Sequence, residues 1–340
     1  MNILHLPSNI SNQPYLFVKG LRQQRINADY LFFKKKKFYE QKGIFDGKNR
    51  IPRYFILMKN FWHAIFNYDI FHFHFNTSFF KNNADLYILK KLNKKIIMQF
   101  WGSDIRIYSI GMKINPFLSE IKSNPKKEKK RLEKIKKISK FVDAAIVSDG
   151  ELFYYIKDYF KKIFFLPQIS DISIFRFPSL EKKEPVIIHA PSNREFKGTE
   201  KIIEVIKELE KKYKFTFKIL ENIPNEQILN EVLNADIVID QILIGTYGIF
   251  SIEAMGCGKP VICYINENYR KFYPEELPIV SASIDNLYVQ LEKLIKDGKL
   301  RHEIGKKSRE YFEKYHAIDV VTKKLIEIYN EVINGDIRKK

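Results

Sequence analysis

The stretch from Gly245 to Val261, GTYGIFSIEAMGCGKPV, joins a glycine-bearing loop, a short predicted helix with one acid, and the start of a buried strand. Gly248 allows the backbone to approach a ligand closely or to adopt a positive φ, and the helix start after it favours an anion. Glu253 follows about 1.4 turns into the helix. Its carboxylate can accept hydrogen bonds from two neighbouring hydroxyls, as a ribose presents them. The pattern predicts a phosphate and sugar-hydroxyl site; the alternative is an ordinary helix-to-strand connection with an exposed acid.

A second loop, APSNREFKGTE at 190–200, lies where a predicted strand ends and a predicted helix begins. Arg194 offers a forked donor and Lys197 a point charge for a diphosphate, and Gly198 opens the way to the free N–H groups of the helix. The loop is not a P-loop, because the sequence contains no Gly-x-x-x-x-Gly-Lys-Ser/Thr run. Surface Arg and Lys are common, so the loop alone is weak support for a diphosphate site. Its place in the same predicted domain as the first motif strengthens that support.

Alternating strands and helices must position both motifs. In the first half we expect strands at 2–6, 28–33, 69–75, 95–100, 144–147 and 163–166, with helices at 14–25, 52–66, 85–92, 125–141 and from 151. The rhythm then restarts, with strands at 185–189, 215–220, 236–240, 261–264 and 277–280, helices at 199–211 and 225–233, and three closing helices. This alternation predicts an α/β protein whose two doubly wound, Rossmann-like parallel-sheet domains face a central cleft.

The domain organisation follows from the same rhythm and from a break in it. Residues 167–185 are rich in proline and charge and lack periodicity, as a linker does. We expect an amino-terminal acceptor-side domain at 1–168, a linker at 169–184, a carboxyl-terminal nucleotide-binding domain at 185–318, and a last helix at 319–340 that packs back on the first domain.

The net charge of +19 is confined to the first half of the chain. Residues 1–170 contain 32 Lys and Arg against 13 Asp and Glu, whereas residues 171–340 contain 27 of each. The excess is concentrated at Lys34–Lys37 and Lys113–Lys140, and the second segment includes a basic helix with apolar residues at three- and four-residue steps. That helix can dock on its own domain or lie on an anionic membrane. The alternative is a solvated helix in a lysine-rich protein.

Bulk properties indicate a folded cytoplasmic protein. The hydrophobic content is 45%, and 340 residues suffice for two cores. The amino terminus lacks the basic start and unbroken apolar run of a secretory signal. The most apolar segment, 54–66, carries Lys59, Asn60 and His63 and is too short to span a bilayer. With the basic first half, this favours a peripheral protein on the inner face of the cell membrane.

The sequence resembles the donor-binding domain of the family 4 retaining glycosyltransferases, which have the GT-B fold. The resemblance rests on Arg194, Lys197-Gly198 and the run Gly248-x-x-x-x-Glu253-Ala-Met-x-x-Gly-x-Pro-Val. The similarity covers nearly the whole chain, including a linking segment at 164–171 and closing helices at 304–330. It implies an enzyme of the bacterial or archaeal surface-polysaccharide or glycolipid type, with a nucleotide sugar such as a UDP-sugar as co-substrate and no cofactor. The implied acceptor is lipid-linked or an oligosaccharide.

Carried over by position, the resemblance assigns the donor contacts. It implies that Arg194 and Lys197 hold the diphosphate and stabilise its charge in the transition state. Backbone N–H groups near Gly248 and Ile249 face the phosphate or sugar, and Glu253 holds the ribose hydroxyls.

One position departs from the family's usual pattern. A second Glu that contacts the donor sugar normally precedes Glu253 by eight residues, and Gly245 stands there instead. Asp240 and Gln241, at the end of the preceding predicted strand, are candidates to replace it.

In the first domain, further candidates follow predicted strands. Trp101 stands where family members often have His and can stack on a sugar, while Asp104 and Arg106 can bind polar groups; Asp104 alternatively caps a turn. His72 and His74 share one face of a strand. Without a third ligand or acid nearby, we expect core packing for His72, a cleft position for His74, and no metal site.

The resemblance also implies the mechanism. The anomeric configuration is retained, the departing phosphate takes the acceptor's proton, and no base is assigned; the sequence has no Asp-x-Asp motif, which fits metal-independent transfer. Another GT-B enzyme, an inverting transferase or a sugar-nucleotide epimerase, is the first alternative. A basic nucleic-acid-binding protein is the second, but the basic helix lacks interleaved aromatics and no nucleic-acid motif occurs, so no nucleic-acid partner is expected.

Overall fold

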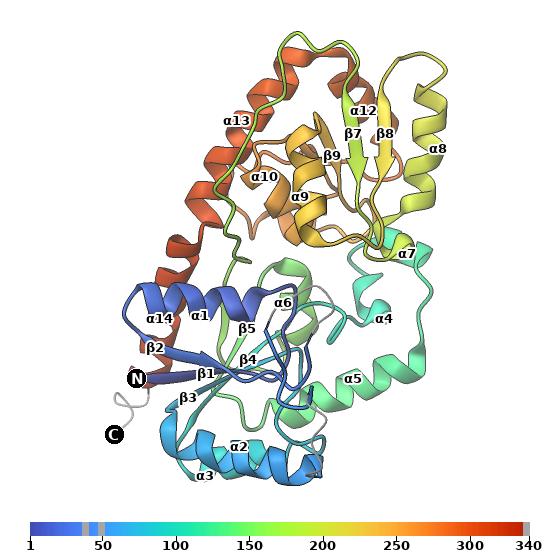
Figure 1. Cartoon of the computed structure of the whole chain (residues 1–340). Coiled ribbons are helices and arrows are strands. Elements are labelled where there is room, and N and C mark those ends of the chain that lie inside the picture. Colours follow the sequence, from blue (N-terminus) through green and yellow to red (C-terminus); the bar gives the residue numbers. More distant parts are fainter. Residues whose placement is uncertain (36–40, 47–51, 336–340) are drawn as a thin grey trace.

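Six parallel strands form the sheet of the amino-terminal domain in a computed structural model that describes residues 1–35, 41–46 and 52–335 (Figure 1). Their order is β2-β1-β3-β4-β5-β6. The strands are short and apolar because helices cover both faces of the sheet. They are β1 (Asn2–Leu6), β2 (Asn27–Tyr30), β3 (Ile70–His74), β4 (Lys95–Gln99), β5 (Ala144–Val147) and β6 (Ile163–Phe165).

Two layers of helices enclose this sheet. One face packs against α1 (Gln13–Gln23) and α14 (Ile318–Asn334). The other packs against α2 (Arg53–Asn67), α3 (Ala84–Lys91), α5 (Pro125–Ile138) and α6 (Gly150–Ile156). Figure 1 shows α1 and α14 on the side of the sheet opposite to α2 and α3. The apolar positions of α5 belong to this core, so the helix docks on its own domain and turns all its lysines but the half-buried Lys134 to solvent.

Four parallel strands form the second sheet in the order β10-β9-β7-β8. They are β7 (Val186–His189), β8 (Thr216–Ile219), β9 (Ile237–Ile239) and β10 (Val261–Ile262). One face packs against α8 (Thr199–Leu209) and α12 (Leu287–Lys296), the other against α9 (Asn225–Asn234), α10 (Ile249–Gly256) and α13 (Gly298–Tyr315). The short helices α7 (Arg194–Lys197) and α11 (Glu267–Arg270) stand in its loops. The predicted α/β fold with two parallel-sheet domains is confirmed.

The predicted strand at 277–280 is wrong in its extent. Only Val280 pairs with the sheet, through a single bridge to Ile262. Pro278 lies within the predicted run and has no N–H to donate, which prevents a regular ladder there.

A segment of the amino-terminal domain crosses to the carboxyl-terminal domain. It contains α4 (Tyr108–Gly111) and the 3-10 helix η1 (Pro116–Glu120), and Figure 1 shows the chain after α4 rising toward α7. Tyr108, Leu118 and Ile121 join the apolar core of the second domain. The crossing segment therefore holds the two domains together on one side of the cleft.

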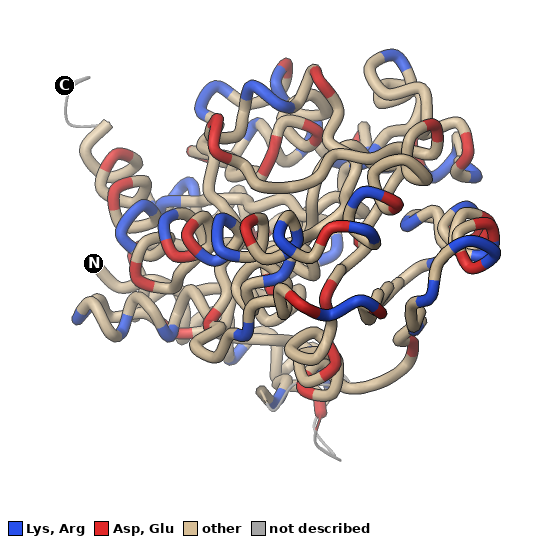
Figure 2. The backbone as a smooth tube through the Cα atoms, turned by 90° about the horizontal axis from the view of Figure 1, so that it is seen from above, with Lys and Arg blue, Asp and Glu red and all other residues tan. Residues whose placement is uncertain are grey.

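The last helix crosses in the opposite direction. After α13, the chain returns to the first domain and α14 packs against α1 through Val321, Leu325 and Tyr329. Figure 2 shows basic and acidic positions interspersed along α13 and α14, in keeping with the neutral second half of the chain. Lys36, Lys37 and residues 336–340 lie outside the described residues. Within the described residues, no helix combines the length and apolarity needed to cross a membrane.

Candidate functional site

A cavity of about 390 Å³ lies between the two domains, where the carboxyl ends of both sheets face each other. Its wall comes from the segments that follow β1, β3, β4, β5, β6, β7 and β9. Ligands of open α/β sheets bind beyond the carboxyl ends of the strands. Its lining residues include Trp101, Arg106, Asp149, Glu151, Gln168, Lys197, Gln241, Tyr247, Gly248 and Ile249.

The amino terminus of α10 opens into this cavity. Gly248 is the N-cap residue, and no side chain caps the helix. The first N–H groups of a helix have no intrahelical partner, and the dipole places positive potential there. Gly248 has a φ of −111°, which excludes the positive φ that was one of its two predicted roles. The other role, close approach of a ligand to the backbone, stays a prediction; the space beside the residue is open, because an added Cβ would meet only an oxygen of Asp240, at 3.9 Å. This terminus can therefore receive an anion.

Asp240 lies behind the cavity wall and contacts two residues that line it, Lys197 and Gly248. This buried carboxylate forms an ion pair with Lys197, accepts a hydrogen bond from Ser251 Oγ at 2.6 Å, and accepts a longer one from the Gly248 N–H at 3.4 Å. Burial alone would raise the pKa of Asp240, but the ammonium of Lys197 and these hydrogen bonds lower it. Asp240 thus stays ionised and fixes the Lys197 ammonium next to the helix terminus.

Arg194 lies apart from Lys197, outside the cavity wall. Its guanidinium pairs with Glu200 at 2.8 Å and with Glu221 at 3.0 Å, and 40% of the side chain is exposed. The two cations predicted to act together are therefore separated in this structure, with Lys197 inside the cleft and Arg194 on the surface beside it.

Glu253 lies one turn beyond the amino terminus of α10 and is half-buried. Asn225, at the start of α9, donates a hydrogen bond from Nδ2 to its Oε1 at 3.1 Å. Burial raises the pKa of Glu253 to about 7. Glu253 does not line the 390 Å³ cavity; its carboxylate is turned toward the start of α9.

Gly245 has a structural reason to lack a side chain. Its φ is +89°, and an added Cβ would lie 2.8 Å from the Cβ of Asn266 and 3.3 Å from Asn115 Nδ2. Asn115 is buried and donates hydrogen bonds to the carbonyl oxygens of Leu243 at 2.7 Å and Ile244 at 2.9 Å. The crossing segment thus occupies the space beside Gly245 and ties the loop between β9 and α10 to the first domain.

This arrangement predicts a difference between two glycines. Gly245→Ala is expected to lower the free energy of unfolding by about 1–3 kcal/mol, because a side chain at positive φ is strained and meets Asn266. Gly248→Ala is the matched control, since its φ suits any residue and its surroundings are open; we expect a change of roughly 0.5 kcal/mol or less. Urea unfolding of both variants measures the difference, and equal losses would contradict it.

Neither candidate to replace the missing Glu is free. Asp240 is committed to Lys197 and Ser251, and the Gln241 amide donates to the carbonyl of Thr246. Gln241 nevertheless lines the cavity, and its hydrogen bond to Thr246 stabilises the loop between β9 and α10.

The loop after β4 shows that one predicted residue is structural. Asp104 accepts hydrogen bonds from the N–H groups of Trp101 at 3.0 Å and Gly102 at 2.8 Å, so it caps a turn, and burial raises its pKa to about 6. Arg106 lines the cavity and forms a bidentate pair with Glu151, with N–O distances of 2.5 and 2.7 Å. Trp101 also lines the cavity.

The expected cleft position of His74 is wrong. His74 is fully buried in the first sheet, where its Nε2 lies 3.0 Å from His5 Nδ1. His5 also supplies the third imidazole that the sequence did not reveal, because the ligand atoms of His5, His72 and His74 lie within 4.8 Å of one another. Tyr329 from α14 contacts both His72 at 2.7 Å and His5 at 3.0 Å. In this structure the imidazoles therefore form a buried hydrogen-bond network.

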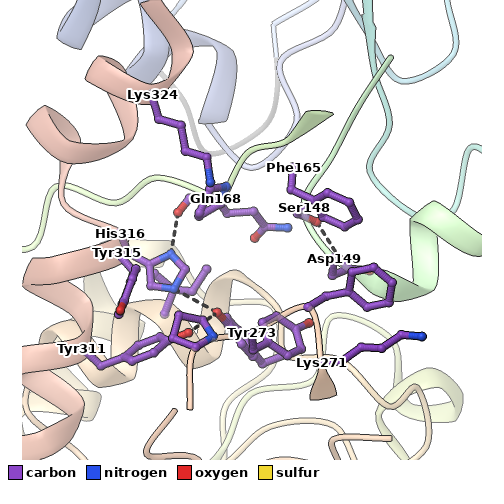
Figure 3. Close-up of a pocket in the computed structure, with 15 residues that line it drawn as sticks. Ser148, Asp149, Phe165, Gln168, Lys271, Tyr273, Tyr311, Tyr315, His316 and Lys324 are labelled. Atoms are coloured by element: carbon purple, nitrogen blue, oxygen red, sulfur yellow. Dashed lines mark hydrogen bonds between the residues drawn. The ribbon is translucent and has the colours of Figure 1, made fainter. Parts of the chain in front are cut away.

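Residues that the sequence did not single out form a second cavity of about 300 Å³ next to the first (Figure 3). Asp149, Gln168 and Tyr247 line both cavities. His316 donates from Nδ1 to the carbonyl of Gln168 at 2.8 Å, and its Nε2 lies 3.1 Å from the Tyr247 hydroxyl. Burial raises the pKa of Asp149 to about 6. In the sequence, the only indication that Asp149 lies at the site is its position just after the predicted strand at 144–147.

Comparison with known proteins gives a family match for part of the second domain. Residues 212–311, which include α10, match the family model described as Glycosyl transferases group 1. Comparison with curated protein sequences gives no significant match.

Solved structures match the fold over nearly the whole chain. Sucrose-phosphate synthase from Thermosynechococcus elongatus has a TM-score of 0.67 at 16% identity, covering 98% of this chain and 100% of its own. HepE of Anabaena, solved with UDP, has a TM-score of 0.60 at 12% identity, covering 97% and 100%. The lipopolysaccharide outer core galactosyltransferase WaaB has a TM-score of 0.60 at 13% identity, covering 99% and 100%. The fold is GT-B, and with the family match the chain is a glycosyltransferase that uses a nucleotide sugar.

Proposed function

We propose that this glycosyltransferase binds the diphosphate of its donor between Lys197 and the amino terminus of α10, and the donor ribose at Glu253. The observation that carries the proposal is the Asp240–Lys197 ion pair beside the uncapped start of α10. An ammonium fixed by a buried carboxylate needs no reorganisation when charge develops on the leaving diphosphate. HepE is solved with UDP and with UDP-glucose, so UDP-sugars are the first donors to test.

We further propose transfer with retention. The acceptor oxygen bonds to the anomeric carbon on the face from which the phosphate oxygen departs, and that oxygen takes the acceptor's proton. The carboxylates in the cavity support this scheme because both are engaged: Glu151 pairs with Arg106, while Asp149 accepts from the Leu152 N–H at 3.1 Å and from Ser148 Oγ at 2.7 Å.

An inverting transferase is the second candidate, and the raised pKa of Asp149 favours it. A base in the cleft with a pKa of about 6 is mostly ionised at neutral pH and more basic than an ordinary Asp, which suits it to proton transfer. Under the retaining scheme, Asp149→Asn is expected to lower kcat tenfold or less, because it alters only a helix cap; an essential base would cost roughly 10²–10⁴-fold. Product stereochemistry by NMR, measured with the same variant, separates the two schemes.

Donor binding is tested directly by a thermal-shift panel of UDP-, GDP- and ADP-sugars. We expect one series to raise the melting temperature, and transfer to persist in EDTA because Lys197 and α10 meet the charge of the leaving group. Turnover of the donor without an acceptor would indicate an epimerase. Salt-sensitive RNA binding without nucleotide-sugar binding would contradict the proposal.

We propose a lipid-linked or glycan acceptor and a peripheral site of action on an anionic membrane, on its cytoplasmic face. The helices α2, α3 and α5 cover the same face of the first sheet. Four aromatic side chains of α2 are 45–80% exposed, namely Tyr54, Phe55, Trp62 and Phe66. Aromatic rings beside lysines suit the interface of an anionic bilayer.

The lysines of α5 provide the test of membrane binding. Changing Lys126, Lys127, Lys129 and Lys130 to Gln is expected to weaken cosedimentation with phosphatidylserine vesicles roughly tenfold or more, since each lysine near an anionic surface adds about 1 kcal/mol. All four side chains are exposed, so the fold should persist. The control neutralises four exposed lysines of the second domain, Lys207, Lys211, Lys296 and Lys299. Equal binding by both variants would contradict a membrane face on α5.

A further inference from the structure

A separate groove of about 890 Å³ opens in the amino-terminal domain beside the start of α2. Its wall is largely apolar, built from Phe33, Phe45, Tyr54, Leu57, Phe79 and Phe80. Buried Asp85 shapes the wall from behind, because it accepts hydrogen bonds from the N–H groups of Phe79 at 2.8 Å and Phe80 at 3.2 Å. An apolar concavity with an ordered wall suits a hydrocarbon ligand.

The same groove is lined by cations. Lys34, Arg53, Lys81 and Lys134 contribute to it, and no Asp or Glu of the described residues does. Lys34, Arg53 and Lys81 are exposed, whereas Lys134 is half-buried and has no ion-pair partner within the described part of the chain. Burial lowers the pKa of Lys134. Burial outweighs the opposing effect of the Asp104 carboxylate, and a cation partly withdrawn from water, with no ion-pair partner among the described residues, favours an anionic ligand.

Two loops line both this groove and the cavity of about 390 Å³ between the domains, which we call the donor cavity. In the loop between β1 and α1, Ser8 and Asn9 line the groove and Ile10 and Ser11 line the donor cavity. In the loop after β3, Thr77 lines the groove while Phe75 lines the donor cavity. A ligand whose charged end reaches these loops is therefore separated from the donor site by one layer of chain.

We propose that this groove holds the hydrocarbon chain of the acceptor, a lipid whose chain ends in a phosphate or diphosphate, with the phosphate on Lys34, Lys81 and Lys134. The inference rests on the proposed function and narrows its acceptor to an anionic lipid. Charge complementarity selects the phosphate, and the aromatic wall selects the chain. Tyr54 joins the groove to the exposed aromatic face of α2, which provides a path from the membrane interface.

Isothermal titration calorimetry with soluble probes, in the absence of a membrane, tests the groove. The probes are farnesyl diphosphate, dodecyl phosphate and inorganic diphosphate. We expect at least one chain-bearing probe to bind at least tenfold more tightly than inorganic diphosphate. Tighter binding of farnesyl diphosphate would identify an isoprenoid source, and tighter binding of dodecyl phosphate an acyl source. Equal binding of inorganic diphosphate, or no binding of either chain, would overturn the proposal.

Matched variants locate the binding. Leu57→Glu places a carboxylate in the groove and is expected to weaken the chain-bearing probe at least tenfold, whereas Phe66→Glu, on the same helix and 80% exposed, leaves it unchanged. Lys81→Gln with Lys134→Gln is expected to weaken it at least tenfold without burying a charge. Unchanged binding in both groove variants would overturn the proposal. Each variant is also tested for the thermal shift with UDP-sugars, which reports the donor site independently of the groove.

Discussion

Lys197→Ala is expected to lower kcat/KM by about 10²–10³-fold, the cost of removing one preorganised donor from a developing anion. Lys197 is 11% exposed, pairs with Asp240 and lines the donor cavity, so water cannot readily replace its charge. Lys201→Ala is the matched control because it removes an exposed lysine of the next helix. Steady-state kinetics with a saturating acceptor measure the loss.

Stability must be separated from catalysis in this experiment. Lys197→Ala leaves the buried Asp240 without its counter-ion, which can cost about 3–5 kcal/mol. The double variant Lys197→Met, Asp240→Asn removes both charges and is expected to recover most of the free energy of unfolding while remaining inactive. Recovered activity in the double variant would contradict the charge role of Lys197. Arg194→Ala, in parallel, tests whether that arginine leaves Glu200 and Glu221 when the donor binds.

The elements that carry the site followed from local pattern. Ile70 to His74 is a buried apolar run, and the structure has a central strand there. The start of α10 at Ile249 follows Gly248, as the glycine and the apolar run predicted. These features depend on residues a few positions apart, so periodicity and helix-start chemistry suffice to find them.

Contacts between distant residues did not follow from pattern. Asn115 donates a hydrogen bond to the carbonyl of Leu243 across 128 positions, and no local feature of the sequence predicted this contact. His5 meets His74 across 69 positions because β1 and β3 are neighbours in the sheet. Strand order decided both the burial of His74 and its partner, and local pattern does not encode strand order.

The loop that precedes α10 is held by contacts from two sides. Asn115 fixes this loop from one side, and His316, at the end of α13, contacts Tyr247 from the other. His316 thus positions the Tyr247 hydroxyl, while Asn115 fixes the carbonyl groups of Leu243 and Ile244 earlier in the same loop. We expect a change in the angle between the domains to strain these contacts, and with them the diphosphate site that we propose at the amino terminus of α10.

Glu253→Gln is expected to weaken binding of the nucleotide sugar about 100-fold, because two hydrogen bonds from ribose hydroxyls to a carboxylate become weaker bonds to a neutral amide. The raised pKa of Glu253, about 7, adds a pH signature. The ionised carboxylate is the better acceptor, so we expect the Kd of the donor to fall as pH rises from 6 to 8 in the wild type and to stay level in Glu253→Gln. Calorimetric titrations with the UDP-sugar measure both.

The same carboxylate gives an opposite trend in stability. Its pKa is raised in the folded state above the ordinary value of 4.5, so the unfolded chain binds fewer protons between about pH 4.5 and 7. The contribution of Glu253 to the free energy of unfolding therefore falls as pH rises through this window and levels off above it, and Glu253→Gln removes that slope. Glu226→Gln, at an exposed position next to Asn225, is the control for charge. Donor binding that is pH-independent in the wild type, or unchanged in Glu253→Gln, would remove Glu253 from the ribose site.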